Sequence, residues 1–218
     1  ESVYLDWTLE WVKACSRHLA PDGIFYIFGQ PGKREHAWIR LCARLVDVLS
    51  FHDLIVWDRV VGYNERRDSF TPQFEMILSL RHPEAKKVYF NKDAVRIPYD
   101  EATIQRYLKD KRYGDKDARE QHLRKGKFAT NILRVPSLKG ASREKVGHPS
   151  QKPLSLVEKL VVSSSRPGDA VLDPFLGSGT TAVAAELNRR EWVGIETDPD
   201  YVRMALKRVS SDRISREI

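Results

Sequence analysis

Two glycines and two carboxylates in one stretch of the chain have the spacing of a nucleotide-binding turn. The stretch reads AVLDPFLGSGTTAVAAELNRREWVGIE and runs from Ala170 to Glu196. A short apolar run ends at Asp173, and Gly177 and Gly179 then allow a sharp backbone turn without Cβ clashes. A second apolar run ends at Glu196, where the acidic residue of nucleotide-binding folds holds the two ribose hydroxyls of an adenosine. The stretch predicts half of a nucleotide-binding α/β sheet.

The glycine pattern also separates classes of cofactor. Folds that bind dinucleotides use a third glycine so that helix, strand and pyrophosphate can approach one another, whereas Thr180 follows Gly179 here. An adenosine without a pyrophosphate, as in S-adenosylmethionine, needs only the turn and the ribose acid. A Gly-x-Gly pair alone is equally typical of an ordinary turn into a helix, so the assignment needs support from the rest of the chain.

The net charge of +7 is unevenly distributed along the chain. Residues 81–152 hold 19 Lys and Arg against 9 Asp and Glu, so the remaining residues have a small acidic excess. Such a concentration of positive charge indicates a polyanionic partner, DNA or RNA, although a charge run is often only a solvated surface. Bases could stack on the aromatic side chains of the same segment, which are Tyr89, Phe90, Tyr99, Tyr107, Tyr113 and Phe128.

Alternating helical and strand patterns predict an α/β fold. Helices are expected over residues 6–20, 33–50, 154–165, 180–190 and 199–209. Strands are expected over residues 24–28, 54–57, 74–80, 170–172 and 192–195. The first strand is apolar throughout, as in a strand buried on both faces of a parallel sheet. Because one strand follows the glycine turn, the other strands come from earlier sequence, and the cofactor half of the domain is last in the chain.

Composition argues against several classes of protein. No apolar run approaches the ~18 residues of a membrane span, and no signal-peptide pattern is present, so we expect a soluble, intracellular protein. Cys15 and Cys42 lack the spacing of metal ligands, which favours buried thiols over a zinc site or a disulfide framework. The chain begins at Glu1 rather than at methionine, and we expect it to be part of a longer protein.

The order of the motifs resembles the beta group of DNA amino-methyltransferases, which methylate the exocyclic nitrogen of adenine or cytosine in bacterial modification systems. The resemblance covers nearly the whole chain. It rests on DPFLGSGTT at 173–181, GHPSQKP at 147–153, VGIETDPDYVRMALKR at 193–208, LAPDGIFYIFG at 19–29 and the loop before FEMILSL at 74–80.

The family's fold is the first expectation that follows from the resemblance. It implies a permuted Rossmann-like methyltransferase sheet, with helices on both faces and a basic, mostly irregular insert. The catalytic half of the domain would be residues 1–80. The target-recognition insert would be residues 81–146, and the cofactor-binding half residues 147–218.

The resemblance also implies roles for individual residues. Phe70, in the polar loop before the strand at 74–80, takes the position that stacks on the target base, although a core position is the alternative. Glu75 is expected to have a structural role. The residues implied to surround S-adenosylmethionine are Asp173, Phe175, Gly177, Ser178, Gly179 and Thr180 at the turn, Glu196 at the ribose, and His148, Gln151 and Lys152 closing over the cofactor.

The implied reaction is direct methyl transfer to the amino group of a base flipped out of double-stranded DNA. Adenine N6 is preferred and cytosine N4 is the alternative. A dehydrogenase or another adenosine-cofactor enzyme is a third hypothesis, which the missing glycine disfavours. We expect no metal and no membrane contact, leave a homodimer open, and place the protein in the cytoplasm of a bacterium or phage host, at the nucleoid.

One family motif is absent from the sequence. The catalytic tetrapeptide of the family, of the type Asp/Asn/Ser-Pro-Pro-Tyr, lies before the first helix there, and no such sequence occurs between Glu1 and Ile218. We therefore assign no catalytic residue within the chain. We expect the loop to be removed or disordered, in preference to the alternative of an inactive DNA-binding relative.

Overall fold

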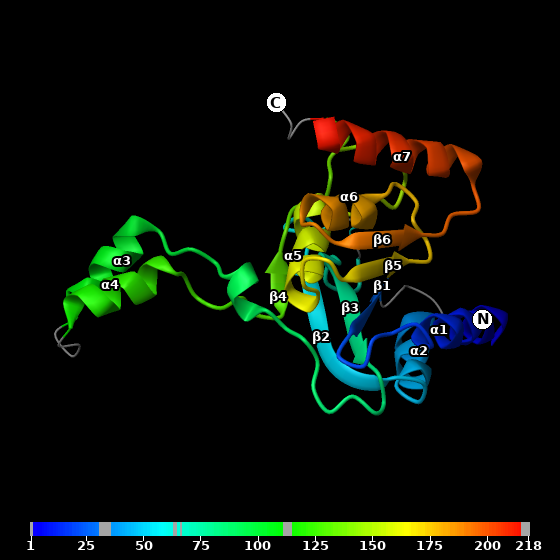
Figure 1. The fold of residues 1–218 in the computed structure, drawn as a ribbon, viewed down its shortest axis with the longest axis horizontal. Helices are drawn as coiled ribbons and strands as arrows, with labels where there is room; N and C mark the ends of the chain where they lie inside the picture. The colour runs from blue at the N-terminus through cyan, green and yellow to red at the C-terminus, as the bar shows by residue number, and fades with distance from the viewer. Residues whose placement is uncertain (1, 31–35, 63–64, 66, 111–114, 215–218) are drawn as a thin grey trace.

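The computed structural model describes residues 2–30, 36–62, 65, 67–110 and 115–214. Within these residues the strands form two sheets (Figure 1). The larger sheet has the order β1-β3-β2-β4, and the smaller one pairs β5 with β6 in parallel. The strands are β1 (Ile24–Gly29), β2 (Ser50–Asp58), β3 (Phe74–Arg81), β4 (Ile132–Arg134), β5 (Ala170–Asp173) and β6 (Glu191–Gly194).

The larger sheet is mixed, because β3 runs antiparallel to β1 and β2 whereas β4 runs parallel to β2. Arg81 of β3 lies opposite Ile24 of β1 and opposite Ser50 of β2. The parallel pairing predicted for β1 is therefore wrong for the neighbour that the structure describes. An apolar run reports burial on both faces of a sheet, and packed helices give the same pattern whatever the direction of the neighbouring strand.

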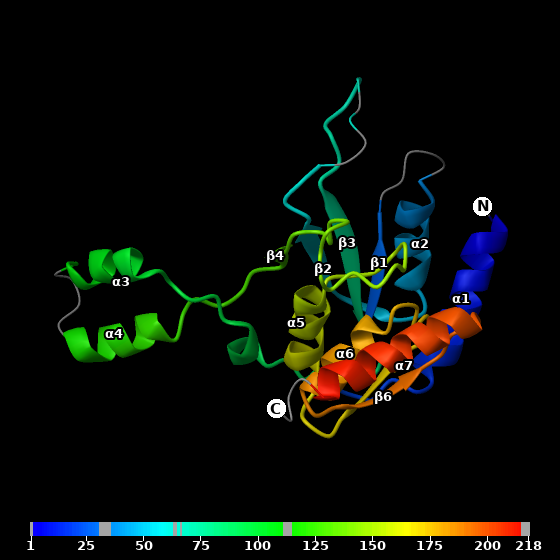
Figure 2. The ribbon, with the colours of Figure 1, turned by 90° about the horizontal axis from the view of Figure 1, so that it is seen from above.

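Helices cover both faces of the larger sheet, as predicted. On one face α1 (Ser2–Ser16) and α2 (Ala37–Leu45) share a core with β1 and β3. On the other face α5 (Leu154–Ser164) packs against β2 and β3. Figure 2 shows α1 and α2 on the opposite side of this sheet from α5.

The smaller sheet has its own helical cover. Helices α6 (Thr180–Leu187) and α7 (Pro199–Ile214) pack on it through Val183, Ala205 and Val209. Helix α5 also contacts this second core, since its Val157 and Val161 pack against Ala184 of α6. One helix thus touches both sheets and holds the two halves of the domain together.

Strand and helix limits differ from prediction mainly before residue 60. Strand β2 begins at Ser50, within the region predicted as helix, and α2 ends at Leu45. The start of that predicted helix, residues 33–35, lies outside the described residues. Helix α1 begins at Ser2 and ends at Ser16, four residues earlier than predicted at each end.

The basic segment contains a helical hairpin that projects from the body of the protein (Figures 1 and 2). After a short 3-10 helix, η1 (Lys92–Val95), come α3 (Glu101–Leu108) and α4 (Lys116–Arg124). Asp100 and Asp115 cap the two helices, accepting the N–H of Thr103 at 2.8 Å and of Ala118 at 2.9 Å. The two helices are in contact, and each buries one apolar residue, Ile104 in α3 and Leu123 in α4. These two helices lie within the insert predicted to be mostly irregular, and neither is among the predicted helices.

Two further expectations concern the membrane and the cysteines. None of the helices in the described part of the chain has the length and apolar character needed to span a bilayer. Both cysteines are half-buried, so the prediction of buried thiols is only partly right. Burial raises the pKa of the Cys42 thiol to about 11 and also raises the pKa of the Cys15 thiol.

Candidate active site

A cleft of about 1020 Å³ lies between the two sheets. Successive residues of both strands line it, Ile24–Phe28 from β1 and Ala170–Asp173 from β5, so each strand presents an edge to the cleft. Trp11 of α1 and Leu160 of α5 belong to its other walls, and the glycine turn and Glu196 also line it. The carboxyl end of β5 therefore opens into the cleft, which is the position of ligand sites in open α/β sheets.

The turn after β5 depends on glycine for two different reasons. Gly177 and Gly179 both have positive φ, +50° and +74°. A Cβ on Gly179 would lie 2.8 Å from the Cβ of Ala205 in α7, so the absence of a side chain also lets α6 and α7 approach closely. A Cβ on Gly177 would lie 3.0 Å from Nε2 of His148. The turn is thus enclosed by α7 and by the loop that carries His148.

Glu196 is fixed by the backbone around it. Its Oε2 accepts the N–H of Gly177 at 2.9 Å, and its Oε1 accepts the N–H groups of Thr197 at 2.7 Å and Asp198 at 2.9 Å. These bonds, that from Asp198 foremost, and the nearby His148 lower the pKa of Glu196 below 4.5. The carboxylate is charged at neutral pH, and Oε2 keeps an acceptor position for a hydroxyl group.

Asp173 and Phe175 shape the start of the turn. The Asp173 side chain accepts the N–H of Phe175 at 3.0 Å. The Phe175 ring then contacts two aromatic residues of α1, with centroid distances of 4.9 Å to Trp11 and 5.8 Å to Trp7. An aromatic wall therefore joins the glycine turn to the first helix of the other half of the domain.

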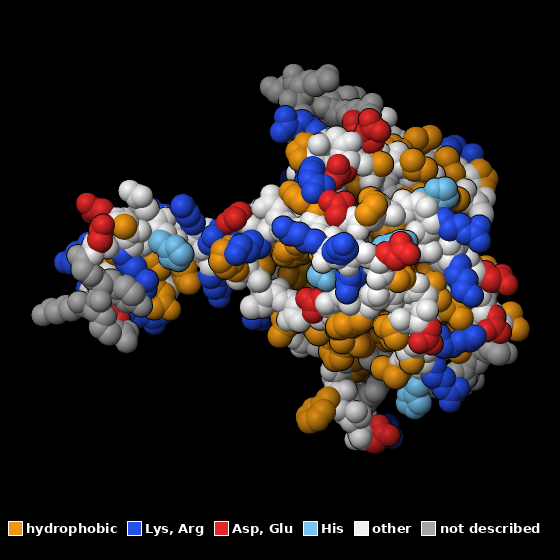
Figure 3. All heavy atoms as spheres, turned by 60° about the horizontal axis from the view of Figure 1, so that its bottom comes forward, with side chains coloured by type: hydrophobic (Ala, Val, Ile, Leu, Met, Phe, Trp, Pro, Cys, Tyr) orange, Lys and Arg blue, Asp and Glu red, His pale blue; other side chains and the backbone are white. Residues whose placement is uncertain are grey.

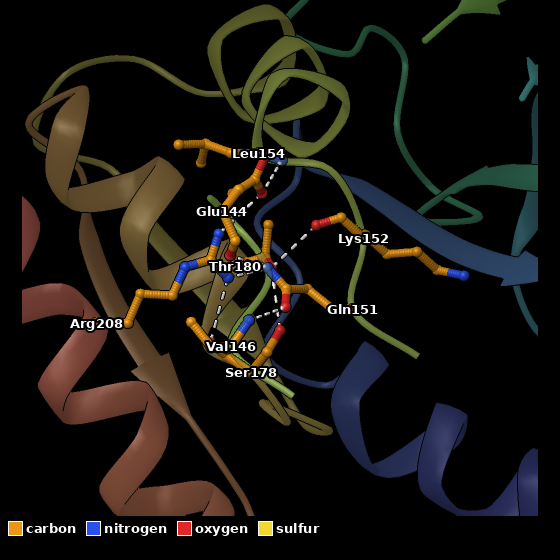
Figure 4. Close-up of polar contacts among 8 residues, drawn as sticks. All are labelled: Glu144, Val146, Gln151, Lys152, Leu154, Ser178, Thr180 and Arg208. Carbon is orange, nitrogen blue, oxygen red and sulfur yellow. Dashed lines mark hydrogen bonds and ion pairs between the residues drawn. The ribbon is translucent and has the colours of Figure 1, made fainter. Parts of the chain in front are cut away.

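Of the three residues predicted to close over the cofactor, His148 lies at the glycine turn. Its ring packs edge-on against Tyr201 of α7, with centroids 4.4 Å apart. The Gln151 side chain bonds within its own loop instead, donating to the carbonyl of Glu144 at 2.8 Å and accepting the N–H of Val146 at 2.9 Å (Figure 4). Gln151 thus stabilises the loop that presents His148.

Lys152 connects the two halves of the domain. Its Nζ lies 2.7 Å from Oε2 of Glu75, which is 7% exposed, and between the rings of Phe28 and Trp57. Its backbone carbonyl accepts the hydroxyl of Thr180 at 3.2 Å. The charged end of Lys152 therefore points to the larger sheet, while its backbone contacts Thr180 at the start of α6.

Arg208 of α7 is a site-supporting residue that the sequence analysis did not identify (Figure 4). Its guanidinium donates to Oγ1 of Thr180 at 2.8 Å, to the carbonyl of Ser178 at 3.3 Å and to Oε1 of Glu144 at 3.0 Å. Glu144 in turn accepts the N–H of Leu154 at the start of α5. The signal in the sequence is an arginine between buried Ala205 and Val209, since a cation at an apolar position of a helix needs a partner.

Phe70 lies away from the core of the protein. Its side chain is 96% exposed, so the alternative of a core position is wrong. An exposed aromatic residue in a loop beside the carboxyl ends of β1 and β2 is available to a ligand. Its predicted stacking on a target base stays a prediction.

The comparisons with known proteins agree on one family. The family model described as DNA methylase matches residues 1–207. The chain is 30% identical over 210 residues to the Type II methyltransferase M.HpaI of Haemophilus parainfluenzae, covering 96% of this chain and 60% of M.HpaI. It is 31% identical over 209 residues to the DNA adenine methyltransferase YhdJ of Escherichia coli K12, covering 96% of this chain and 68% of YhdJ.

Solved structures show the same fold. The M1.HpyAVI–SAM complex superposes with a TM-score of 0.63 at 25% identity, over 92% of this chain and 81% of that one. The cytosine-N4-specific PvuII DNA methyltransferase superposes with a TM-score of 0.67 at 18% identity, over 96% and 75% of the two chains. The predicted Rossmann-like methyltransferase fold is thereby confirmed.

Proposed function

The chain belongs to the DNA methylase family, and from this membership we propose that it transfers a methyl group from S-adenosylmethionine to adenine N6 in double-stranded DNA. The preference for adenine over cytosine N4 is supported by the likeness to a named adenine methyltransferase over 96% of the chain. The observation that carries the proposal is the charged Glu196 carboxylate, which is fixed against the glycine turn.

The residues around the turn fit S-adenosylmethionine. Glu196 would accept a ribose hydroxyl through Oε2, and the aromatic wall of Trp7, Trp11 and Phe175 would border the cofactor's apolar and cationic parts. Asp173 holds the start of the turn, and His148 covers Gly177. When bound, the cofactor supplies an electrophilic methyl group on a sulfonium.

Phe70, which lies outside the residues that line the cleft, and the cleft walls would bind the base and exclude water. The target base is flipped out of the duplex, because its amino group is not accessible inside the base stack. The exposed Phe70 ring would stack on that base, and the walls from α1 and α5 would keep the attacking nitrogen away from solvent. The contribution of these residues is positioning and desolvation.

The helical hairpin of α3 and α4, with the two segments that lead to it, forms an arm that would contact the DNA. Figure 3 shows Lys and Arg side chains on the arm, at its junction with the body and on the neighbouring face of the body. Lys109, Lys116 and Lys125 on the hairpin are all exposed. Exposed cations on a projecting element are suited to phosphate contacts, which supply much of the affinity of proteins for DNA.

Calorimetric titration with S-adenosylmethionine tests the cofactor assignment. We expect Glu196→Gln to weaken binding at least tenfold, since the charged acceptor is lost. Glu191→Gln is the matched control, because it makes the same change at the exposed start of β6. Tight binding of NAD that is insensitive to Glu196→Gln would overturn the assignment.

Incubation of the longer protein, in which we expect the catalytic tetrapeptide, with duplex DNA and cofactor carrying a labelled methyl group tests the reaction. Chromatography of the digested DNA should show labelled N6-methyladenine. Labelled N4-methylcytosine would instead establish the second candidate activity. Cofactor and DNA binding without any labelled nucleoside would favour the DNA-binding relative without activity and contradict the proposed reaction.

A further inference from the structure

The helical arm is attached to the body of the protein through a narrow root. We define the arm as residues 97–127, excluding 111–114, which the structure does not describe. Figures 1 and 2 both show α3 and α4 separated from the sheets, with two extended segments leading to them. At the root Ile97 and Lys127 form an antiparallel bridge, with N···O distances of 2.8 and 2.9 Å. The geometry of this bridge therefore sets the direction of the arm relative to the body.

Arg96 joins the outgoing and the returning segments at the root. Its Nε donates to Oδ1 of Asp93 at 2.6 Å, and its Nη1 donates to the carbonyl of Gly126 at 2.7 Å. The guanidinium carbon lies 3.9 Å from the centre of the Phe128 ring. The Arg96 side chain is only 16% exposed. This cation is therefore engaged by protein groups on several sides.

The surrounding contacts fix this junction to the body. The Asn91 N–H donates to the carbonyl of Ser163 at the end of α5 at 2.7 Å, and the Asn91 side chain caps η1. Lys92 lies 4.3 Å from the Phe128 ring centre, so the ring contacts two cations. Gly126 has a φ of +80°, and a Cβ there would lie 2.5 Å from the carbonyl oxygen of Ile97.

A small rotation at the root would move the arm's tip by a distance that matters to DNA. The four residue-to-residue steps of the extended segment from Arg96 to Asp100 span about 13 Å, and the eight residues of α3 add about 12 Å. A rotation of about 10° at the root then displaces the tip by roughly 4 Å, which exceeds the 3.4 Å rise per base along a strand. The arm can therefore read a fixed register only if its root is rigid.

We propose that Arg96 and Phe128 form a brace that sets the direction of the arm, and that Arg96 is a positioning residue rather than a phosphate contact. The inference rests on the proposed DNA contact of the arm. It also assigns Phe128, one of the aromatic residues considered for stacking on bases, to the support of the arm. The brace determines which sequence is bound, while exposed lysines of the hairpin supply charge.

The variants Arg96→Lys, Arg96→Met and Phe128→Leu test the brace. Lysine keeps the charge but lacks the planar fork that bonds Asp93 and Gly126 together and stacks on Phe128. We therefore expect Arg96→Lys to behave like Arg96→Met. Each of the three variants should lower affinity for the preferred sequence, selected from duplexes with a randomised centre, at least tenfold. Affinity for unselected duplex should change less than threefold.

The salt dependence of binding separates a brace from a phosphate contact. Loss of one phosphate contact reduces the slope of log affinity against log salt by about 0.9, whereas loss of the brace should leave the slope unchanged. Lys116→Gln is the control for loss of a contact. If Arg96→Met lowers the slope by about 0.9 while Arg96→Lys and Phe128→Leu bind like the unaltered protein, Arg96 is a phosphate ligand and the brace is overturned.

Hydrogen exchange in the free protein tests the brace without DNA. The amides of Ile97 and Lys127 should exchange at least tenfold faster in Arg96→Lys and Phe128→Leu, and the double variant Arg96→Met/Phe128→Leu should not exceed the stronger single variant. Unchanged exchange at both amides would overturn the brace. Faster exchange together with no DNA binding by the unaltered protein would leave the brace standing and overturn the proposed DNA contact.

Discussion

Glu196 is a carboxylate whose charge is stabilised by three backbone N–H groups before any ligand arrives. Because its pKa is lower in the folded protein than the 4.5 expected for an unfolded chain, deprotonation favours folding. Its contribution to the free energy of unfolding should be complete above about pH 4.5 and should be lost as the pH falls through the lower folded pKa. Denaturant unfolding across this range should show a steeper acid loss in the unaltered protein than in Glu196→Gln. If stability falls with pH equally in both proteins, the pKa of Glu196 is not lowered by folding.

Gly179 shows how a single residue sets the packing of two helices. Gly179→Ala combines a positive φ with a Cβ only 2.8 Å from Ala205, so we expect it to lower the free energy of unfolding by roughly 2–4 kcal/mol. Gly168→Ala isolates the backbone strain, since Gly168 has a φ of +89° and open space around it. It should cost about 1 kcal/mol.

The same series contains a rescue and a control. Ala205→Gly in the Gly179→Ala background removes the contacting methyl group and should recover part of the loss. Gly140→Ala should be neutral within about 0.5 kcal/mol, because its φ is not positive and a Cβ there would have no atom within 4 Å. Equal effects of Gly179→Ala and Gly168→Ala in denaturant unfolding would show that α7 relaxes away from the turn.

Among the elements, α7 supports the glycine turn through Arg208. Arg208→Met would leave Glu144 without its buried cation and release the loop that presents His148. Loss of one partner of a largely buried ion pair costs about 3–5 kcal/mol, and partial exposure of Glu144 places the expected loss at the lower end. Cofactor affinity should fall as well.

Arg203→Met is the matched control for this element. Arg203 lies on the same helix and pairs with Asp200, but both side chains are mostly exposed. An exposed pair contributes about 0–1 kcal/mol, so the control should unfold at nearly the same denaturant concentration as the unaltered protein. If Arg208→Met loses stability but binds the cofactor with unchanged affinity, the network stabilises the fold without positioning the site.

Local patterns predicted the cofactor half better than the rest of the chain. The strand, glycine turn, helix and strand between Ala170 and Gly194 follow each other as expected, since periodicity and glycine positions are local signals. The antiparallel direction of β3, the extended start of β2 and the helix α4 depended on pairing and capping that periodicity does not report. Helix α4 has few apolar residues and begins at the Asp115 cap.

For the candidate site, positions along the backbone could be predicted better than the contacts of side chains. The sharp turn at Gly177 and the place of Glu196 after a strand could be predicted, because turn chemistry and strand ends are visible in the sequence, whereas their cofactor contacts stay a prediction. The directions of long side chains could not be predicted. Lys152 bonds to Glu75 of β3, and Gln151 bonds to its own loop. The contact of Lys152 joins segments that are 77 residues apart in the sequence, and only the folded structure brings them together.

At the scale of the whole molecule, binding and chemistry are assigned to different parts. The cleft lies between two sheets that α5 holds together, while the arm projects from the body on a braced root. Residues 81–152 have a net charge of +10, of which residues 97–127, which contain the arm, hold +3, and the rest of the chain has an acidic excess. Changes to the arm should therefore affect DNA binding and leave the cofactor site unaltered.

Replacing three exposed lysines of the arm tests this separation. The triple variant Lys109→Gln, Lys116→Gln and Lys125→Gln should reduce the slope of log affinity for duplex DNA against log salt by up to about 2.7, because each lost phosphate contact removes about 0.9. The control triple Lys13→Gln, Lys159→Gln and Lys207→Gln removes the same charge from the body. If both triples change the slope equally, DNA responds to net charge alone and the arm is not the contact surface. If only the arm triple does so, with unchanged calorimetric affinity for the cofactor, the two functions are separate.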